Sequence, residues 1–443
     1  MQLRIYHQQK NNKIDLNIHY LFYIMNITID NEYSKIKEYY DDTLNKDENL
    51  VKTPNDEPTP LTCVEEMVDK VPEEFWKRKD IKILDPCCGC GNFPVVIYFK
   101  LMKHHTKEHI LNNILYFNDL NEDRIAVLKS VFNYEKLNIY TEDFLKLNTD
   151  IRFDLISANP PYAKLDENGR RTAKNHNLIG LFINKSLELL NDGGFLLYIT
   201  PDNWMSYADR NTLIGVLTQL QIHYINIHIA KKYFPKVGSS FVWYLIEKTP
   251  SYKDIVVEGK WKETLYISKV KSEKRRYIPL YYNKMVHKIL SKTLDDTRLD
   301  KFKVETTSYL HKYTKREFIS KDKDEIYKYK LIHTPKQIVW SSKPHKYQEG
   351  WKVFISTTSY YGTFVDNCGM TQSIAFIRCK DENEANNISK VLGHPLYKFV
   401  NDICRYGNFN NIRILQSFPY CKDYDEVYKK FKITKKERKF IER

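Results

Sequence analysis

The stretch Asn159-Pro160-Pro161-Tyr162 directly follows the apolar run 153–158, and it decides how the rest of this sequence is interpreted. The run predicts a short buried strand, and the carboxyl ends of strands are where an open α/β sheet places its chemistry. The two prolines fix φ and remove two backbone donors, so the loop is stiff and its carbonyl oxygens are left to accept hydrogen bonds. Stiff acceptors beside the Asn159 amide suit a substrate amino group, and the Tyr162 ring offers a face for stacking. The alternative is a proline turn that only ends a strand.

Length and composition indicate a globular protein with more than one domain. At 443 residues the chain is too long for one ordinary core, so two domains are expected. The net charge of +14 favours a polyanionic partner, with nucleic acid ahead of a membrane. The sequence is also rich in Lys, Asn, Ile and Tyr, as AT-rich genomes encode, so charge alone does not decide the partner.

Cysteines and apolar runs indicate the compartment. Eight cysteines occur, three of them in Cys87-Cys88-Gly89-Cys90. This spacing lacks two matching C-x2-C pairs, so reduced thiols in a tight turn are a better interpretation than zinc, and no metal is expected. Nothing suggests a secreted disulfide framework, which predicts a cytoplasmic or intracellular location. The apolar run 20–25 is far shorter than the ~20 residues of a membrane span, and residues 1–24 are expected to be peripheral to the fold.

Three strands before the Asn159 loop also end in residues that can bind a ligand. A loop of small residues after the strand 81–84 lets a ligand approach the backbone beside the N-terminus of the next helix. Asp119, at the tip of the second strand, is placed to accept hydrogen bonds from ribose hydroxyls. Acids at consecutive strand ends favour a ligand site over ordinary loop acids. The predicted strands and their ends are 81–84 with the loop 85–93, 114–118 with Asp119, 137–140 with Asp143-Phe144, and 153–158 with Asn159.

Predicted strands and helices alternate over residues 81–229, which favours a mostly parallel sheet. Before them, Thr59 is expected to cap a helix whose first residue is Pro60. The polar and basic segment 163–177 is expected to be a loop over the site.

Beyond Thr249 the alternation stops, and strand-like pieces are mixed with basic loops. Helices are expected at 382–391 and 397–403, and the Lys/Arg-rich tail from Lys429 is expected to be a solvated end. Interleaved basic and aromatic residues are typical of nucleic-acid surfaces, although an ordinary solvated face is the alternative. The pattern predicts a second domain of α+β type.

With these residues placed, the sequence resembles the N6-adenine DNA methyltransferases of restriction-modification type, in the gamma arrangement with the catalytic domain first. The resemblance covers about residues 58–248 and follows the family's order of motifs. Segments similar to motifs X, I, II, III, IV, V, VI and VIII are, in turn, Thr59-Pro60, 85–93, Asp119, Asp143-Phe144, 159–162, Gly180-Leu181-Phe182, Ile199-Thr200-Pro201 and Phe234-Pro235. Cysteines stand where motif I has other small residues, and the region beyond Thr249 matches only loosely.

The resemblance implies roles for these residues. Asn159 Oδ1 and the Pro160 carbonyl would accept the two hydrogens of the adenine N6 amine, in the loop that Pro161 stiffens. Tyr162 and Phe234 would stack on the two faces of a flipped-out base. S-adenosylmethionine would supply the methyl group. The implied cofactor-binding residues are Thr59, Pro60, Asp85, Pro86, Cys87, Gly89, Gly91, Asn92, Phe93, Asp119, Leu120, Asp143, Phe144, Asn159 and Phe182.

The expected fold class is α/β, a Rossmann-like S-adenosylmethionine-dependent methyltransferase sheet followed by an α+β DNA target-recognition domain. The expected parts are an N-terminal extension (1–50), a catalytic domain (51–249) and a target-recognition domain (250–443). The expected function is site-specific adenine-N6 methylation of double-stranded DNA by a monomer, with a cognate restriction endonuclease as a candidate partner and no membrane. The alternatives are cytosine-N4 methylation, which more often has Ser in place of Asn159, an RNA or protein-glutamine methyltransferase, and a non-catalytic nucleic-acid-binding protein.

Overall fold

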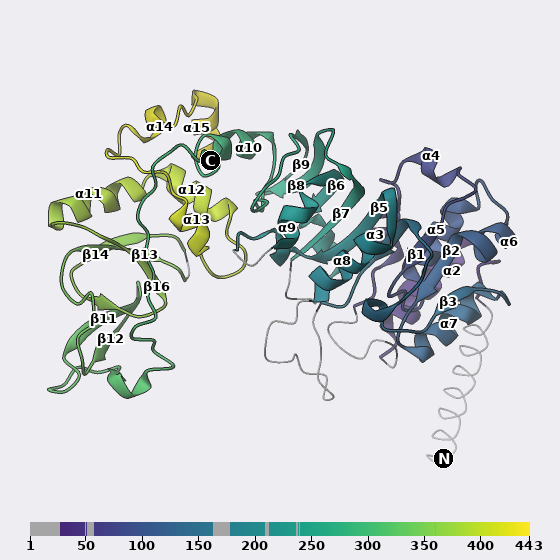
Figure 1. The fold of residues 1–443 in the computed structure, drawn as a ribbon, viewed down its shortest axis with the longest axis horizontal. Helices are drawn as coiled ribbons and strands as arrows, with labels where there is room; N and C mark the ends of the chain where they lie inside the picture. The colour runs from purple at the N-terminus through teal and green to yellow at the C-terminus, as the bar shows by residue number, and fades with distance from the viewer. Residues whose placement is uncertain are drawn as a thin grey trace, which may run out of the picture. The chain divides into compact units, whose positions relative to one another are not determined.

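The computed structural model describes two compact units (Figure 1). The described residues are 27–48, 50, 57–162, 178–208, 212–235, 238, 240–358 and 360–443. The first unit extends to Pro201 and resumes over Leu217–Glu258, and the second holds Asp202–Val216 and Gly259–Arg443. The predicted loop 163–177 and the segment 1–24 lie outside the described residues. Within those residues, no helix has the length and apolar character needed to cross a membrane.

The first unit is organised around one sheet. Its strands are β1 (Ile83–Asp85), β2 (Leu115–Asn118), β3 (Asn138–Tyr140), β4 (Phe153–Ala158), β5 (Leu190–Pro201), β6 (Leu220–Ile227), β7 (Phe241–Pro250) and β8 (Ile255–Trp261). Their order is β3-β2-β1-β4-β5-β7-β6-β8. β1 pairs in parallel with both β2 and β4, while β7 runs antiparallel between β5 and β6. The strand order therefore reverses between β1 and β4, which is where open α/β sheets bind their ligands.

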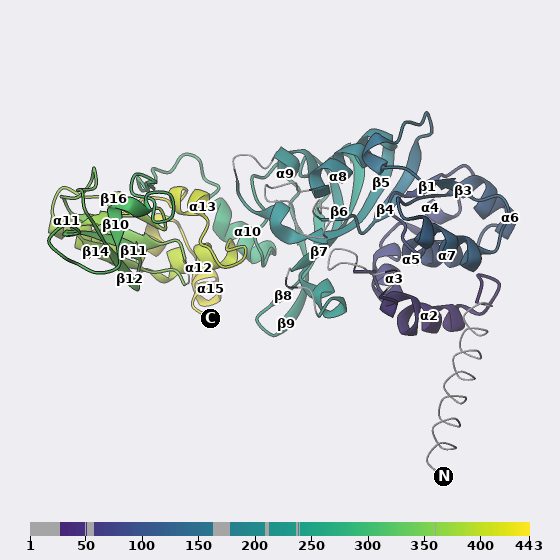
Figure 2. The ribbon, with the colours of Figure 1, turned by 90° about the horizontal axis from the view of Figure 1, so that it is seen from below.

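Helices cover this sheet and connect its strands. They are α2 (Tyr33–Asp42), α3 (Leu61–Val68), α4 (Glu73–Trp76), α5 (Asn92–Leu101), α6 (Lys107–His109), α7 (Glu122–Phe132) and α8 (Leu178–Leu189), with short 3-10 turns η1 (Leu44–Lys46), η3 (Phe144–Lys146) and η5 (Ile229–Tyr233) and a π turn η2 (Ile110–Ile114). The 3-10 turn η4 (Asp202–Met205) and most of α9 (Thr212–Leu217) fall in the second unit. α3 packs on α5, and α2 packs on α3 (Figure 2). α2 buries Ile36, Tyr39 and Tyr40, so this N-terminal helix belongs to the core of the first unit.

Thr59 does not cap α3, so this prediction is wrong. The helix begins at Leu61, and its N-cap position is held by Pro60, which makes no side-chain cap. The Thr59 hydroxyl instead accepts a hydrogen bond from Asn159 Nδ2 at 3.0 Å. Thr59 therefore lies one residue before the N-cap position, and its hydroxyl faces the Asn159 amide.

The second unit mixes two small sheets with helices, as predicted from its α+β pattern. One sheet has the order β10-β12-β11-β15 and the other β14-β13-β16. The strands of these two sheets are β10 (Ile319–Ser320), β11 (Tyr329–Thr334), β12 (Gln337–Ser341), β13 (Lys352–Ser356), β14 (Thr363–Asp366), β15 (Gly369–Met370) and β16 (Ile374–Arg378). β9 (Thr264–Val270) is not part of either small sheet, because it is the last strand of the large sheet, next to β8. The helices are α10 (Lys284–Ser291), α11 (Glu382–Leu392), α12 (Pro395–Ile403), α13 (Ile412–Gln416), α14 (Val427–Lys430) and α15 (Lys435–Ile441), with the 3-10 turn η6 (Arg316–Phe318).

The Lys/Arg-rich tail is folded, and the prediction of a solvated end is wrong. Thr434 and Glu437 form a capping box at the start of α15. The Glu437 carboxylate is buried and binds Lys292 Nζ at 2.7 Å. The Phe440 ring stacks on Trp261 with centroids 5.0 Å apart. In this segment the buried residues recur at helical spacing between exposed basic residues. The many charged residues led to the prediction of a solvated end, although the helical spacing is present.

The buried Glu437 gives the second unit a testable pH dependence. Burial alone raises the pKa of this carboxyl, but hydrogen bonds from Lys292 and Thr434 outweigh it and hold the pKa below its ordinary value. Glu437→Gln is expected to lower the free energy of unfolding in urea by about 1 kcal/mol at pH 7, because a charged hydrogen bond to a partly exposed lysine is lost.

A group with a lowered folded-state pKa stabilises the fold above the pKa of the unfolded chain. The difference between parent and Glu437→Gln should therefore disappear as the pH falls through the folded-state pKa of Glu437. Lys435→Gln, an exposed change on the same helix, is the control. A difference that persists in acid would contradict the role of the ion pair.

Candidate active site

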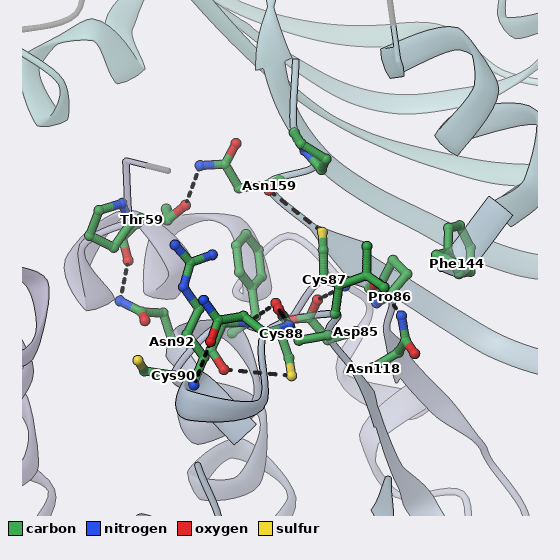
Figure 3. Close-up of a pocket in the computed structure, with 18 of the residues that line it drawn as sticks. Thr59, Asp85, Pro86, Cys87, Cys88, Cys90, Asn92, Asn118, Phe144 and Asn159 are labelled. Carbon is green, nitrogen blue, oxygen red and sulfur yellow. Dashed lines mark hydrogen bonds between the residues drawn. The ribbon is translucent and has the colours of Figure 1, made fainter. Parts of the chain in front are cut away.

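A pocket of about 950 Å³ lies in the first unit at the carboxyl ends of β1, β2, β3 and β4 (Figure 3). Most of the predicted site residues line it: Thr59, Asp85, Pro86, Cys87, Gly89, Asn92, Phe93, Asp119, Leu120, Asp143, Phe144, Asn159, Pro161 and Phe182. The remaining predicted residues are not part of the lining: Pro60, Gly91, Pro160, Tyr162 and Phe234. The structure therefore brings most of the predicted site residues together around one pocket.

Asp119 braces the loop that follows β1. Its Oδ2 accepts a hydrogen bond from the Gly89 backbone N–H at 2.8 Å, and its Oδ1 accepts one from the Asn121 N–H at 2.8 Å. The side chain is buried apart from a 7% exposed fraction, yet it lines the pocket. Each carboxylate oxygen has a second lone pair. Asp119 can thus hold the loop and still accept hydrogen bonds from a ligand.

The pocket is acidic although the chain as a whole is basic. Its lining contains Glu57, Asp85, Asp119, Glu142 and Asp143. Burial raises the pKa of the Asp85 carboxyl well above its ordinary value, and the nearby Asp119 raises it further. The hydrogen bond from the Cys87 N–H lowers the Asp85 pKa but does not outweigh burial. Among the lining residues that the structure describes, Arg124 is the single Lys or Arg, and its guanidinium donates to the Leu50 carbonyl. Such a lining favours a cationic ligand over a phosphate.

The thiols of the loop are free and protonated. Burial raises the pKa of Cys87 and Cys88 well above the ordinary value and that of Cys90 to about 12. The thiolate is the nucleophilic form of cysteine. These thiols are therefore structural, as the sequence predicted; the Cys87 thiol donates to the Asn159 carbonyl at 3.6 Å.

The Asn159 side chain is held in one orientation. Its Nδ2 donates to the Glu57 carbonyl at 3.1 Å and to the Thr59 hydroxyl at 3.0 Å. A backbone carbonyl can only accept, so the amide nitrogen must face it and Oδ1 must face away. Figure 3 shows the nitrogen turned toward Thr59 and the oxygen pointing away from it. Oδ1 accepts a hydrogen bond from the Tyr162 hydroxyl at 2.5 Å and keeps one lone pair for a further donor.

Several curated proteins with similar sequences are methyltransferases. The profile described as Eco57I restriction-modification methylase matches residues 95–232. The release factor glutamine methyltransferase of Clostridium botulinum is 31% identical over 167 aligned residues, covering 31% of this chain and 53% of that protein. The type II methyltransferase M.VspI of a Vibrio species is 24% identical over 169 residues, covering 35% and 39%. The solved DrdV–DNA complex shares the fold at a TM-score of 0.50 and 12% identity, covering 93% of this chain and 60% of that one.

The predicted resemblance to restriction-modification methyltransferases is confirmed. The strand order and the position of the pocket also confirm the predicted Rossmann-like methyltransferase fold. The matches span about half or less of the length of these curated relatives.

Tyr162 and Phe234 both contact a third ring, Phe241. The Phe234 ring stacks on Phe241 with centroids 4.5 Å apart, and Tyr162 meets Phe241 edge-on at 5.8 Å. Phe234 is fully buried. The structure thus does not bring Phe234 to an open surface, and its stacking on a methylated base stays a prediction that requires the ring to turn outward. Tyr162 is half-buried beside Asn159.

The sequence did not predict the N-terminal wall of this pocket. Leu44, Asn45 and Leu50 line it, ahead of the predicted catalytic region. Asn92 Nδ2 joins this wall to the site, because it donates to Asn45 Oδ1 and to the Thr59 carbonyl, both at 2.9 Å. Nothing in the local sequence of α2 indicates that this helix folds against a loop some fifty residues later.

Tyr40 on α2 supports the loop directly. Its hydroxyl donates to the Cys90 carbonyl at 2.7 Å. Gly91 follows with φ of +99°, and a Cβ there would lie 3.2 Å from the Tyr40 hydroxyl, so glycine is required at this close approach. The loop conformation therefore depends on a helix from the N-terminal segment.

Tyr40→Phe is expected to weaken the binding of S-adenosylhomocysteine severalfold, since one hydrogen bond of about 1 kcal/mol that holds the loop is lost while the ring packing stays. Isothermal titration calorimetry measures it. Tyr39→Phe, on the same helix, is the matched control, because its hydroxyl makes no hydrogen bond to the part of the chain that the structure describes. Equal affinities of the Tyr40→Phe variant and the parent would contradict the supporting role.

Proposed function

We propose that this chain is a site-specific DNA methyltransferase that transfers a methyl group from S-adenosylmethionine to N6 of adenine. The orientation of the Asn159 amide carries the proposal. Glu57 and Thr59 fix Nδ2, so Oδ1 is a preset acceptor beside the pocket. An acceptor that is already oriented suits the exocyclic amine of adenine, because the protein then spends no free energy on reorganising Asn159 when the substrate binds.

The N6 amine of adenine is a poor nucleophile because its lone pair is delocalised into the ring. Asn159 Oδ1 and the Pro160 carbonyl accept its two hydrogens, which lets the nitrogen pyramidalise toward a reactive lone pair. When bound, S-adenosylmethionine would supply an electrophilic methyl group, whose bond to sulfur breaks as its bond to N6 forms, and the surplus proton of N6 would pass to water. Asn159 and Pro160 then contribute positioning and electrostatics, without a base of tuned pKa.

The lining residues fit S-adenosylmethionine. Its sulfonium and ammonium groups suit a lining that contains the acidic residues Glu57, Asp119, Glu142 and Asp143. Asp119 accepts from the ribose hydroxyls with its second lone pairs. Phe144 and Phe182 contact each other, with ring centroids 5.3 Å apart, and would form one wall of the cleft for the cofactor adenine, whose amino group would donate to Asp143. Thr59 and Asn92 lie at the end that holds the methionine part.

The second unit is proposed to recognise the target sequence. Double-stranded DNA matches the net charge of +14, and a solved protein of similar fold is described as a complex with DNA. An adenine in a duplex cannot reach Asn159, so it must be flipped out. A monomer would act beside a cognate restriction endonuclease.

Glutamine methylation in a protein is the second candidate, because a release factor glutamine methyltransferase is among the relatives. A glutamine amide is also a flat –NH2 group that Asn159 could bind. Radiolabelled S-adenosylmethionine should be incubated with unmethylated plasmid DNA, total RNA and a glutamine-containing peptide in parallel. The proposal expects label in DNA alone, and label in the peptide or RNA would contradict it.

A further inference from the structure

Two aromatic rings of the second unit are exposed on neighbouring loops, with a guanidinium beside one of them. Tyr360 is 83% exposed and Phe409 is 65% exposed. The Arg405 guanidinium carbon lies 5.7 Å from the centroid of the Tyr360 ring. Within the described ranges, no other aromatic ring packs on either one. We call Tyr360, Arg405 and Phe409 the aromatic platform.

The platform is built on a rigid base. The backbone of Phe409 forms an antiparallel bridge with Thr358. The next residue, Asn410, is 2% exposed, and its side chain donates to the Ser356 carbonyl at 2.8 Å and accepts from Asn401 Nδ2 at 2.9 Å. A buried amide with its partners satisfied fixes the loop that carries Phe409. Rings held this way lose little conformational entropy when a partner binds.

The Arg405 side chain is tied into the same loop. Its Nη2 donates to the Asn408 carbonyl at 3.1 Å, one residue before Phe409. Gly407 lies between them with φ of +72°, a left-handed turn that favours glycine. The cation is thereby kept next to the exposed rings rather than free to leave them.

We infer that the aromatic platform stacks on bases of the DNA that the second unit binds; this rests on the proposed function. Flat rings beside a guanidinium match bases beside phosphates, since every base has a π-face and Arg adds cation–π and charge attraction. A protein partner fits less well, because a stable interface buries about 800 Å² on each side. Here Thr358, Gly407 and Asn408, three of the residues close to the rings along the chain, are polar or glycine.

In a duplex, rings of this kind can reach base faces by entering a base step and partly unstacking it. Binding is therefore expected to distort the duplex where the aromatic platform enters it. The platform is expected to contribute to the binding free energy through base stacking rather than through ion pairs with phosphates.

The test compares the affinity of the full chain and its variants for a fluorescent mixed-sequence duplex. Tyr360→Ala and Phe409→Ala should each weaken binding about fivefold or more, from the stacking of ~1–3 kcal/mol per base. Tyr360→Phe and Phe409→Tyr should retain parental affinity, because the ring remains. The slope of log affinity against log salt should stay parental in the alanine variants, since no counterion release is lost.

Tyr252→Ala is the matched control, because this tyrosine is 62% exposed and has Lys253 Nζ 5.3 Å from its ring but belongs to the first unit. Its affinity should equal that of the parent. Parental DNA affinity in Tyr360→Ala and Phe409→Ala would overturn the inference and point to a protein or another occupant of the platform. A loss of DNA affinity in Tyr360→Phe and Phe409→Tyr as large as in the alanine variants would also overturn it. If the parent methylates DNA, such a failure leaves the proposed function intact. A parent that neither binds nor methylates DNA would overturn both.

Discussion

Asn159→Ala is expected to reduce methyl transfer by about 100- to 1000-fold, the range seen when one preset polar group is removed from a reaction centre. The variant removes the acceptor for the amine hydrogens and leaves the acidic lining of the pocket in place. The affinity for S-adenosylhomocysteine should therefore stay close to parental. Single-turnover transfer of labelled methyl groups and calorimetric titration separate the two quantities.

Asn159→Asp is a sharper version of the same experiment. A carboxylate has no hydrogen for the Glu57 carbonyl, which lies 3.1 Å from Nδ2 in the parent. Two oxygens at that distance repel each other, so the side chain should turn and misplace its acceptor. Transfer should fall strongly although an acceptor oxygen is still present.

Asn191→Ala is the control, because this asparagine lies at the opposite, amino end of β4, where it donates to Asp154. It should leave transfer unchanged. Parental activity in Asn159→Ala would refute the assignment of the site.

Asp119→Ala is expected to weaken S-adenosylhomocysteine binding by about 10- to 100-fold, because each hydrogen bond to a charged group contributes ~1.5–3 kcal/mol. The change removes the acceptor of the Gly89 and Asn121 N–H groups as well as the proposed acceptor of the ribose hydroxyls. Loop geometry and ligand contact are lost together.

Two further variants separate these contributions. Asp119→Asn retains one acceptor oxygen and should fall between parent and Asp119→Ala. Asp123→Ala changes an acid near the start of α7 that does not line the pocket, and it should bind as the parent does. An Asp119→Ala variant with parental affinity would contradict the cofactor site, whatever the substrate is.

Local patterns were enough for the centre of the first unit. The run 153–158 is β4 in the structure, and Asp119 and Asn159 follow their strands as predicted. This success has a physical reason, because apolar runs of strand length and the polar residues that end them are set by neighbours in sequence. Parallel strands then gather those ends at one edge of the sheet.

Long-range partners could not be predicted in the same way. Asn159 is oriented by Glu57, 102 positions earlier, and the Cys90 carbonyl is held by Tyr40, 50 positions earlier. The sequence also did not show that Phe234 would pack on Phe241. Which ring meets which, and which carbonyl meets which amide, depends on how the whole unit packs.

The most direct test of the central claim is nucleoside mass spectrometry. Unmethylated plasmid DNA is incubated with the protein and S-adenosylmethionine, then digested, with Asn159→Ala treated identically. The account predicts N6-methyladenine with the parent and its loss with the variant. N4-methylcytosine, or no methylated nucleoside in DNA while a peptide or RNA is labelled, would contradict it.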